Sequence, residues 1–459
     1  MRVVFITFFR KSKGGGVGRV SYEIAQAFAQ QGHETVLIRP GEKTQLKKVA
    51  PHLEYLQIRS IGEGDVAIPY LTVSNLKFLF NFLEKFSPQI VHSHDFGPLT
   101  LTTQFWAINH EIPFIYTTHV LLTKPADFAI NEFSKILKHL MDTTLVKKYF
   151  FSFFKNCDAF IALNKDTQKD ILKYGFREKV FTIPNGHYLN AYQRCYLAKL
   201  SEKQKQLTFI GYLSKRKNQK YLFWVMECLP ENFVLNLIGA PINPKYLQEL
   251  KAYVQKKGLK NVNFLGEVPY EKIAGLLEKT HVFVSASKME VQSLVIIEAL
   301  ASGTPVVGLS NETVSEFIDD SVGFRLEEKT SPKTFAEKVK KICSLSQKEY
   351  EFLCHNARKK VAHLDWPDIV KQTEMVYQKL IKEKKINRGE KKMSNIKEIL
   401  KMLPPPKIKS FLQKKVQKSG GKISKKRSIL MFIMTIIGTF FIGIGYWLLS
   451  KTKRIPISR

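Results

Sequence analysis

The sequence predicts two α/β domains built on parallel sheets, followed by an apolar segment long enough to cross a membrane. Short apolar runs alternate with longer helical patterns over residues 1–190, and the same alternation returns over 200–365. The chain has 459 residues, too many for one ordinary core, and 44% of them are hydrophobic, as in a packed globular protein. Residues 429–449 then contain no charged side chain.

The first domain opens with a strand at 3–9, a glycine-rich turn at 14–18, a helix around 21–31 and a second strand at 34–38. This order of elements is the usual opening of a parallel sheet with crossover helices. Further short apolar runs predict strands at 90–92, 114–117, 159–162 and 180–183. We therefore expect the first domain to span residues 1–190.

The second domain repeats the pattern and is expected to span residues 200–365. Its strand-like apolar runs occur at 207–210, 233–238, 262–264, 282–284 and 305–307. A helix is predicted next, at 366–382. It opens with Trp366-Pro367, and proline is well tolerated in a first helical turn. We expect this helix to return to the first domain.

The composition changes after residue 382. Residues 383–428 are rich in lysine and are predicted to form a basic linker. The apolar segment 429–449 can span a hydrocarbon core of about 30 Å as a helix. Because the basic linker precedes it, the positive-inside rule predicts a single-pass protein of the cell membrane with its large domains in the cytoplasm. A basic tail at 450–459 weakens this charge bias.

The charge of the chain indicates which class of partner it binds, and its cysteines indicate the compartment in which it folds. The chain has 72 Lys+Arg against 40 Asp+Glu, a net charge of +32, which favours nucleic acid, an anionic membrane surface or phosphorylated ligands. No nucleic-acid-binding signature accompanies this excess, and much of it lies beside the apolar segment, so an anionic membrane surface is the favoured partner. The five cysteines form no C-x-x-C pair, which indicates a reducing compartment and no structural zinc.

Two motifs suggest that the chain binds a phosphorylated ligand. Gly15 and Gly16 lie in the glycine-rich turn, where the backbone can approach a ligand closely and helix-terminal amides attract an anion, although such a turn is often only a turn. The second motif follows the strand at 282–284. It carries Glu290, then a helix from 292 to 302 with Glu298 inside it. The start of this helix can hold a diphosphate.

The second motif, Glu290-x7-Glu298 followed by Ala-x-Ala-x-Gly-x-Pro-Val-Val, resembles the retaining glycosyltransferases of family 4. The resemblance covers residues 1–382 and includes several ordered motifs: Gly15-Gly16, Gly32-His33-Glu34, His92-Ser93-His94-Asp95, Thr117-Thr118-His119, Ile183-Pro184-Asn185-Gly186, Gly211-Tyr212-Leu213-Ser214 with Lys217, and Phe264-Leu265-Gly266. It implies the GT-B fold, in which two Rossmann-like domains face each other across a cleft.

The resemblance also implies roles for individual residues. His119 and Glu290 correspond to catalytic residues near the reacting sugar, and Glu298 to the residue that binds the nucleotide ribose. Lys217 corresponds to a lysine that neutralises the diphosphate. The remaining donor-binding positions are Gly15, Gly16, Gly211, Val291, Gln292, Ser293 and Leu294. Taken alone, Lys217 would more often be a solvated surface lysine and His119 a satisfied buried histidine.

The chain departs from the family pattern at the diphosphate. Tyr212 stands where the family usually has arginine, and Lys215 or Arg216 could supply the missing cation. Asn218 stands where glycine usually follows the lysine. No Asp-x-Asp motif is present, so we expect a reaction without metal or cofactor, in which the sugar nucleotide is a substrate.

One histidine pair resembles a metal site. His92 and His94 are residue types that bind metals, but we expect the two side chains to face opposite sides of a strand and not to share an ion.

The predicted function is transfer of a hexose from a UDP- or GDP-linked sugar to a membrane lipid on the cytoplasmic face. Two alternatives stay open: the same chemistry on a soluble or polysaccharide acceptor, and a non-catalytic scaffold that binds sugar nucleotide.

Overall fold

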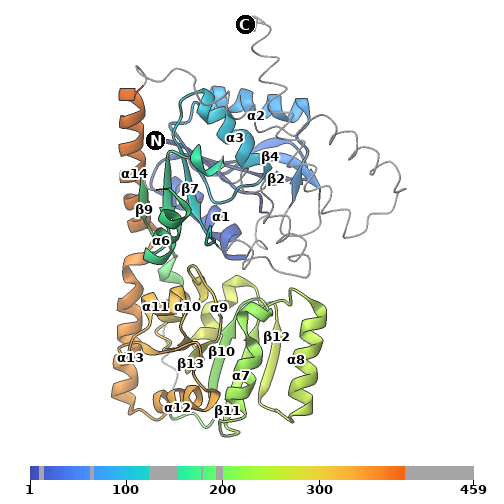
Figure 1. Ribbon diagram of the computed structural model, residues 1–459, viewed down its shortest axis with the longest axis vertical. Helices are drawn as coiled ribbons and strands as arrows, with labels where there is room; N and C mark the ends of the chain where they lie inside the picture. The colour runs from blue at the N-terminus through green and yellow to red at the C-terminus, as the bar shows by residue number, and fades with distance from the viewer. Residues whose placement is uncertain (10–14, 62–66, 124–152, 177–178, 193–199, 388–459) are drawn as a thin grey trace, which may run out of the picture. The chain divides into compact units, whose positions relative to one another are not determined.

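The computed structural model describes residues 1–9, 15–61, 67–123, 153–176, 179–192 and 200–387. The described residues divide into two compact units: residues 1–117, 153–160 and 373–387 in the first, and residues 118–123 and 161–372 in the second. Residues 161–190 lie in the second unit by this division, so the predicted domain limits of 1–190 and 200–365 stay a prediction. Figure 1 shows the elements of both units.

The first sheet has the strand order β3-β4-β2-β1-β6-β7-β8-β9, with β5 paired to β4. Strand β1 is parallel to β2 and to β6, and β6 is parallel to β7, whereas β3 and β5 run antiparallel to β4. The strands span Arg2–Ile6 (β1), Glu34–Gly41 (β2), Gln45–Ala50 (β3), Leu53–Ile61 (β4), Ile68–Pro69 (β5), Ile90–Ser93 (β6), Phe114–Thr118 (β7), Ala159–Ala162 (β8) and Val180–Thr182 (β9).

Helix α1 (Gly15–Gln30) corrects the predicted helix at 21–31. It begins at the glycine-rich stretch, so Gly15 and Gly16 lie in its first turn and not in a separate turn before it. Gly18, also in this helix, packs closely against Phe9: a Cβ there would lie 3.1 Å from the Cβ of Phe9. Helices α2 (Val73–Phe86), α3 (Pro98–Asn109) and α6 (Lys165–Tyr174) also pack on this sheet, against β4, β6 and β9 respectively.

Strands β3, β4 and β5 were not predicted. Every side chain from Gln45 to Val49 in β3 is exposed, because this strand lies at the edge of the sheet. An edge strand therefore lacks the buried apolar run by which the other strands were recognised. Lysines 47 and 48 are typical of edges that avoid pairing with another chain.

The second sheet has the order β12-β11-β10-β13-β14-β15, and every adjacent pair is parallel. Its strands span Lys205–Ile210 (β10), Phe233–Ile238 (β11), Val262–Gly266 (β12), Val282–Ser285 (β13), Val306–Leu309 (β14) and Gly323–Leu326 (β15). Relabelled in chain order this is 3-2-1-4-5-6, the doubly wound Rossmann order. The direction of winding reverses between β10 and β13.

Two apolar cores lie on opposite faces of this sheet, because successive strand residues point to opposite sides. Helices α7 (Gln219–Met226), α8 (Pro244–Lys256) and α12 (Pro332–Cys343) contribute to the core around Leu207, Phe209 and Leu235. Helices α9 (Ile273–Leu277), α10 (Leu294–Ala301) and α11 (Glu312–Phe317) contribute to the core around Ile210 and Phe283. Helix α13 (Gln347–Val361) contributes to both.

Helix α14 (Trp366–Asn387) starts where 366–382 predicted a helix and continues five residues further. Its first residues belong to the second unit, where the backbone amide of Trp366 donates to the carbonyl of His187 at 3.2 Å. From Thr373 it belongs to the first unit, where the hydroxyl of Tyr377 lies 2.5 Å from Nδ1 of His92.

The described residues hold no helix long and apolar enough to cross a membrane. The predicted membrane span at 429–449, the tail at 450–459 and all of the basic linker 383–428 beyond residue 387 lie outside the described residues. These three expectations therefore stay predictions.

Candidate active site

The candidate site lies where the second sheet reverses its winding. In open α/β sheets a crevice forms there, outside the carboxyl ends of the strands, and ligands bind in it. Strand β10 leads into residues 211–218, which we call the β10 loop, and β13 leads into residues 286–293, the β13 loop. The two strands are direct neighbours, with Thr208 opposite Phe283, so both loops leave the same edge side by side. These loops carry Lys217 and Glu290.

The β10 loop is shaped by backbone conformations that few residues accept. Gly211 has φ +149°, and a Cβ on Gly239 of the neighbouring loop would lie 2.1 Å from the Gly211 carbonyl oxygen. Lys215–Lys217 form a single 3-10 turn capped by Ser214, and Asn218 follows in the left-handed region at φ 55°. Asparagine is one of the few residues other than glycine that tolerate this region. This explains how Asn218 can stand where the resemblance implies a glycine.

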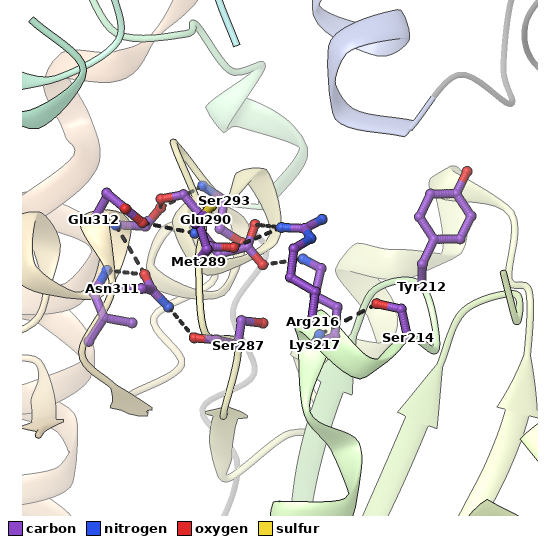
Figure 2. A network of polar contacts seen from close by, with 12 residues as sticks. Tyr212, Ser214, Arg216, Lys217, Ser287, Met289, Glu290, Ser293, Asn311 and Glu312 are labelled. Atoms are coloured by element: carbon purple, nitrogen blue, oxygen red, sulfur yellow. Dashed lines mark hydrogen bonds and ion pairs between the residues drawn. The ribbon is translucent and has the colours of Figure 1, made fainter. Parts of the chain in front are cut away.

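Lys217 and Glu290 meet across the two loops as an ion pair in hydrogen-bond contact (Figure 2). The guanidinium of Arg216 lies 3.6 Å from the other carboxylate oxygen of Glu290 and donates to the Met289 carbonyl at 2.7 Å. Glu290 is 7% exposed. Burial raises the pKa of Glu290, but Lys217, Arg216 and the Ser287 hydroxyl outweigh burial and hold the pKa below its usual value. Glu290 is therefore ionised at neutral pH.

The structure distinguishes the two candidate replacement cations. Arg216 lies at the carboxylate of Glu290, whereas the side chain of Lys215 is exposed to solvent. The ring of Tyr212 points away from Arg216 and Lys217 (Figure 2). Arg216 thus supplies a second positive charge at the pair, and Tyr212 does not occupy its place.

Residues that the sequence analysis missed support the β13 loop from α11. The Asn311 side chain donates to the Ser287 carbonyl at 2.9 Å, and a Glu312 carboxylate oxygen accepts the Glu290 amide at 3.0 Å. The Thr313 hydroxyl accepts the Ser293 amide at 2.8 Å. One signal was available: Asn311 is a good helix cap four residues after the strand predicted at 305–307, and the corresponding strand β14 neighbours β13.

The remaining predicted residues of the β13 region are largely engaged within the protein. The Val291 side chain is buried against Leu121 and Leu163, and its carbonyl accepts from Asn164 at 2.5 Å. The Gln292 side-chain oxygen accepts the Asn185 amide at 2.7 Å. The predicted helix at 292–302 is α10, which starts at Leu294 after the cap Ser293.

Glu298, the predicted ribose ligand, lies one helical turn inside α10 and is 1% exposed. The first-turn amides of α10 start at Leu294, the predicted donor-binding position that directly follows the β13 loop. The described geometry leaves the donor-binding roles of both residues as predictions.

His119 follows β7 in the second unit and is half-buried. Desolvation lowers the pKa of His119 to about 3, so its imidazole is neutral at physiological pH. A neutral imidazole offers one donor and one acceptor nitrogen and no charge. Gly15 and Gly16 belong to the first unit, at the start of α1, whereas His119, Lys217, Glu290 and Glu298 belong to the second.

The expectation that the side chains of His92 and His94 face opposite sides of the strand was wrong. Their rings stack at 4.6 Å between centroids, because residues two apart on a strand point to the same side. Both nitrogens of His92 are engaged, Nδ1 with Tyr377 at 2.5 Å and Nε2 with Thr117 at 2.7 Å. His92 therefore links α14 to β7 through two buried hydrogen bonds.

Comparison with known families identifies each half of the chain separately. Residues 14–190 match the family described as Glycosyltransferase Family 4. Residues 198–360 match the family described as Glycosyl transferases group 1. The second match contains Lys217, Glu290 and Glu298.

Two curated relatives have names that specify a lipid. The chain is 24% identical over 276 residues to alpha-monoglucosyldiacylglycerol synthase of Streptococcus pneumoniae, covering 56% of this chain and 61% of the relative. It is 23% identical over 398 residues to one component of the phosphatidylinositol N-acetylglucosaminyltransferase of Arabidopsis thaliana, covering 83% of each.

Solved structures share the fold. Sucrose-phosphate synthase of Thermosynechococcus elongatus superimposes with a TM-score of 0.64 at 18% identity, covering 83% of this chain and 99% of that one. HepE of Anabaena, solved with UDP and glucose, superimposes with a TM-score of 0.62 at 17% identity, covering 82% of this chain and 99% of that one. Together with the mainly parallel first sheet and the doubly wound second sheet, these likenesses confirm the predicted α/β fold of two Rossmann-like domains, as in GT-B proteins.

Proposed function

Because this chain belongs to the glycosyltransferases of group 1 and family 4, we propose that it transfers a hexose from a UDP- or GDP-linked donor to a membrane lipid, with retention of anomeric configuration. The observation that carries the proposal is the pairing of Lys217 and Arg216 with Glu290 at the switch point of a Rossmann sheet. Two cations beside one carboxylate suit a ligand with a diphosphate next to a sugar.

The two cations account for stabilisation of the leaving group. When the bond between the anomeric carbon and the diphosphate breaks, negative charge grows on the phosphate oxygens. Lys217 and Arg216 stabilise that charge, and the first-turn amides of α10 add partial positive charge. Preorganised donors of this kind typically contribute about 10²- to 10³-fold each in rate.

Retention follows from attack on the face that the leaving group vacates. The acceptor hydroxyl forms the new bond to the anomeric carbon while the carbon–phosphate-oxygen bond breaks, and its proton passes to the departing diphosphate. Glu290 binds hydroxyls of the sugar, Glu298 binds the ribose, and neutral His119 hydrogen-bonds near the reacting centre. The low pKa of His119 is consistent with a hydrogen-bonding role and not with proton donation.

The lipid acceptor and the location are supported by the chain outside the site. Residues 429–449 are uncharged, and the chain carries +32 net charge with basic residues concentrated before that segment. The names of two relatives specify diacylglycerol and phosphatidylinositol. We infer a single-pass membrane protein whose catalytic domains lie in the cytoplasm, against an anionic surface.

The test is transfer by the purified full-length chain. Radiolabelled UDP- and GDP-hexoses are incubated with it and with vesicles of total membrane lipid, and the lipid phase is separated by thin-layer chromatography. A labelled glycolipid is expected, absent with Glu290→Gln. Label in a soluble or polysaccharide product would favour the other acceptor class. Nucleotide binding without any product would favour the scaffold.

A further inference from the structure

Residues Asn311, Glu312 and Thr313 open α11 and contact the β13 loop without belonging to the Glu290-x7-Glu298 motif. Thr313 is fully buried and Asn311 is 8% exposed. Figure 2 shows Asn311 and Glu312 beside Glu290, Ser287 and Ser293. We call these three residues the α11 clamp.

The clamp holds the backbone of Glu290 at both its amide and its carbonyl. Glu312 accepts the Glu290 amide at 3.0 Å, and the Thr313 hydroxyl donates to the Glu290 carbonyl at 3.3 Å. The same hydroxyl accepts the Ser293 amide at 2.8 Å. Fixing both backbone groups of Glu290 fixes the direction of its Cα–Cβ bond, and the side chain beyond that bond reaches Lys217.

The clamp is itself fixed to the sheet. The Asn311 side-chain oxygen caps α11 by accepting the amides of Thr313 and Val314, while its nitrogen donates to the Ser287 carbonyl. Close packing adds to this, since a Cβ on Gly308 would lie 2.9 Å from Val314. Gly308 pairs with Ser285 at the end of β13. The clamp and the β13 loop are thus anchored to the same pair of strands.

We propose that Glu312 and Thr313, oriented by Asn311, are positioning residues that aim the Glu290 carboxylate at the sugar-donor site. This inference rests on the proposed function and adds residues outside the motifs that identify the family. Neither residue touches the reacting atoms. Their removal should let Glu290 turn away from Lys217, and a displacement of about 1 Å from productive geometry can cost about 10²-fold in rate.

The test compares two variants of Thr313, one that lacks the hydroxyl and one that keeps it. Thr313→Val keeps the shape and loses both hydrogen bonds, whereas Thr313→Ser keeps the hydroxyl. In the full-length chain with its donor and lipid, Thr313→Val should lower kcat about 10- to 100-fold with a smaller change in donor KM. Thr313→Ser should stay near wild type. Ser315→Ala is the matched control, because Ser315 lies on α11 and its hydroxyl contacts Ser310.

A purely structural role for the clamp predicts a different result. Thr313→Val would then lower the melting temperature but keep kcat within about twofold of wild type. Alternatively, Thr313→Ser would be as impaired as Thr313→Val. Either result overturns the proposal.

An activity-independent measurement is the crystal structure of the double variant Thr313→Val with Glu312→Ala. The Glu290 carboxylate should leave Lys217, and an unmoved carboxylate contradicts the proposal. Lack of product from the wild type would instead refute the proposed function.

Discussion

The ammonium group of Lys217 is paired with the carboxylate of Glu290, although the two residues lie 73 positions apart in the sequence. The pair joins the loops that leave β10 and β13, and Arg216 adds a second cation to it. In the proposed reaction these cations serve the diphosphate. A donor entering the site must therefore compete with Glu290 for Lys217.

Replacing Glu290 by glutamine should separate binding from transfer. Glu290→Gln frees Lys217 and Arg216, so UDP or GDP should bind about tenfold more tightly, the scale of one charge-assisted hydrogen bond. Transfer should fall by at least about 10²-fold because the sugar loses its carboxylate. Calorimetric titration with each nucleotide and the labelled-lipid assay measure the two effects. Weaker nucleotide binding by Glu290→Gln would show that Glu290 does not compete with the diphosphate.

The ion pair also makes stability depend on pH. The folded pKa of Glu290 lies below its usual value of 4.5, so the pairing stabilises the fold above pH 4.5 and the contribution is lost as pH falls through the folded pKa. Wild type should be more stable than Glu290→Gln at pH 7, and the difference should shrink below pH 4.5. Urea unfolding at pH 7, 5 and 4 measures it. A constant difference across that range contradicts the pairing.

His119 should not titrate in the physiological range. Its pKa of about 3 in the folded chain compares with 6.5 for an ordinary histidine. The unfolded chain takes up this proton below pH 6.5 and the folded chain does not, so His119 makes stability fall as pH drops from 6.5 toward 3. With ¹³C-labelled histidine, the His119 ring signal, assigned by its loss in His119→Gln, should stay constant from pH 5 to 8. A shift centred near pH 6.5 would contradict a neutral His119 ring.

Gly186 is required where the chain packs against Trp366, the first residue of α14. A Cβ there would lie 2.3 Å from the indole of Trp366, a buried ring that cannot move aside cheaply. Gly186→Ala should destabilise the fold by about 1–3 kcal/mol, the usual cost of overpacking. Gly275→Ala is the control, because Gly275 lies in α9 with open space around its Cβ position. Gly275→Ala should raise the free energy of unfolding by about 1 kcal/mol, because alanine has a higher helix propensity than glycine. Urea unfolding of both variants decides between these expectations.

Elements that are stabilised by burial of their own apolar residues could be predicted from the sequence, whereas elements that depend on pairing with distant residues could not. The strand prediction for 282–284 matches β13 because a strand buried on both faces of the sheet is a continuous apolar run. Strand β3 was missed because its stability comes from pairing with β4, which leaves no apolar run in its own residues. The β10 and β13 loops were found through motifs. Their pairing depends on strand order, and parallel neighbours cannot be read from local sequence.

The same reasoning explains the clamp and the histidines. Asn311, Glu312 and Thr313 act through hydrogen bonds to residues 20 or more positions earlier, and no short motif records such contacts. The sequence named Arg216 and Lys215 as candidates for the missing cation. Only the folded turn at Lys215–Lys217 shows which of the two lies at Glu290. The error at His92 and His94 was one of strand geometry and not of missing information.

Release of nucleoside diphosphate is the most direct measure of the proposed reaction, because it reports sugar transfer whatever the acceptor is. Full-length wild type, Glu290→Gln and Lys217→Ala are each supplied with UDP- and GDP-hexoses in the presence of membrane-lipid vesicles, and free UDP or GDP is measured by a coupled enzyme assay. We expect lipid-dependent release by the wild type from at least one donor, reduced by about 10²-fold or more in both variants. Equal release by all three proteins would contradict a sugar-transfer site at Lys217 and Glu290.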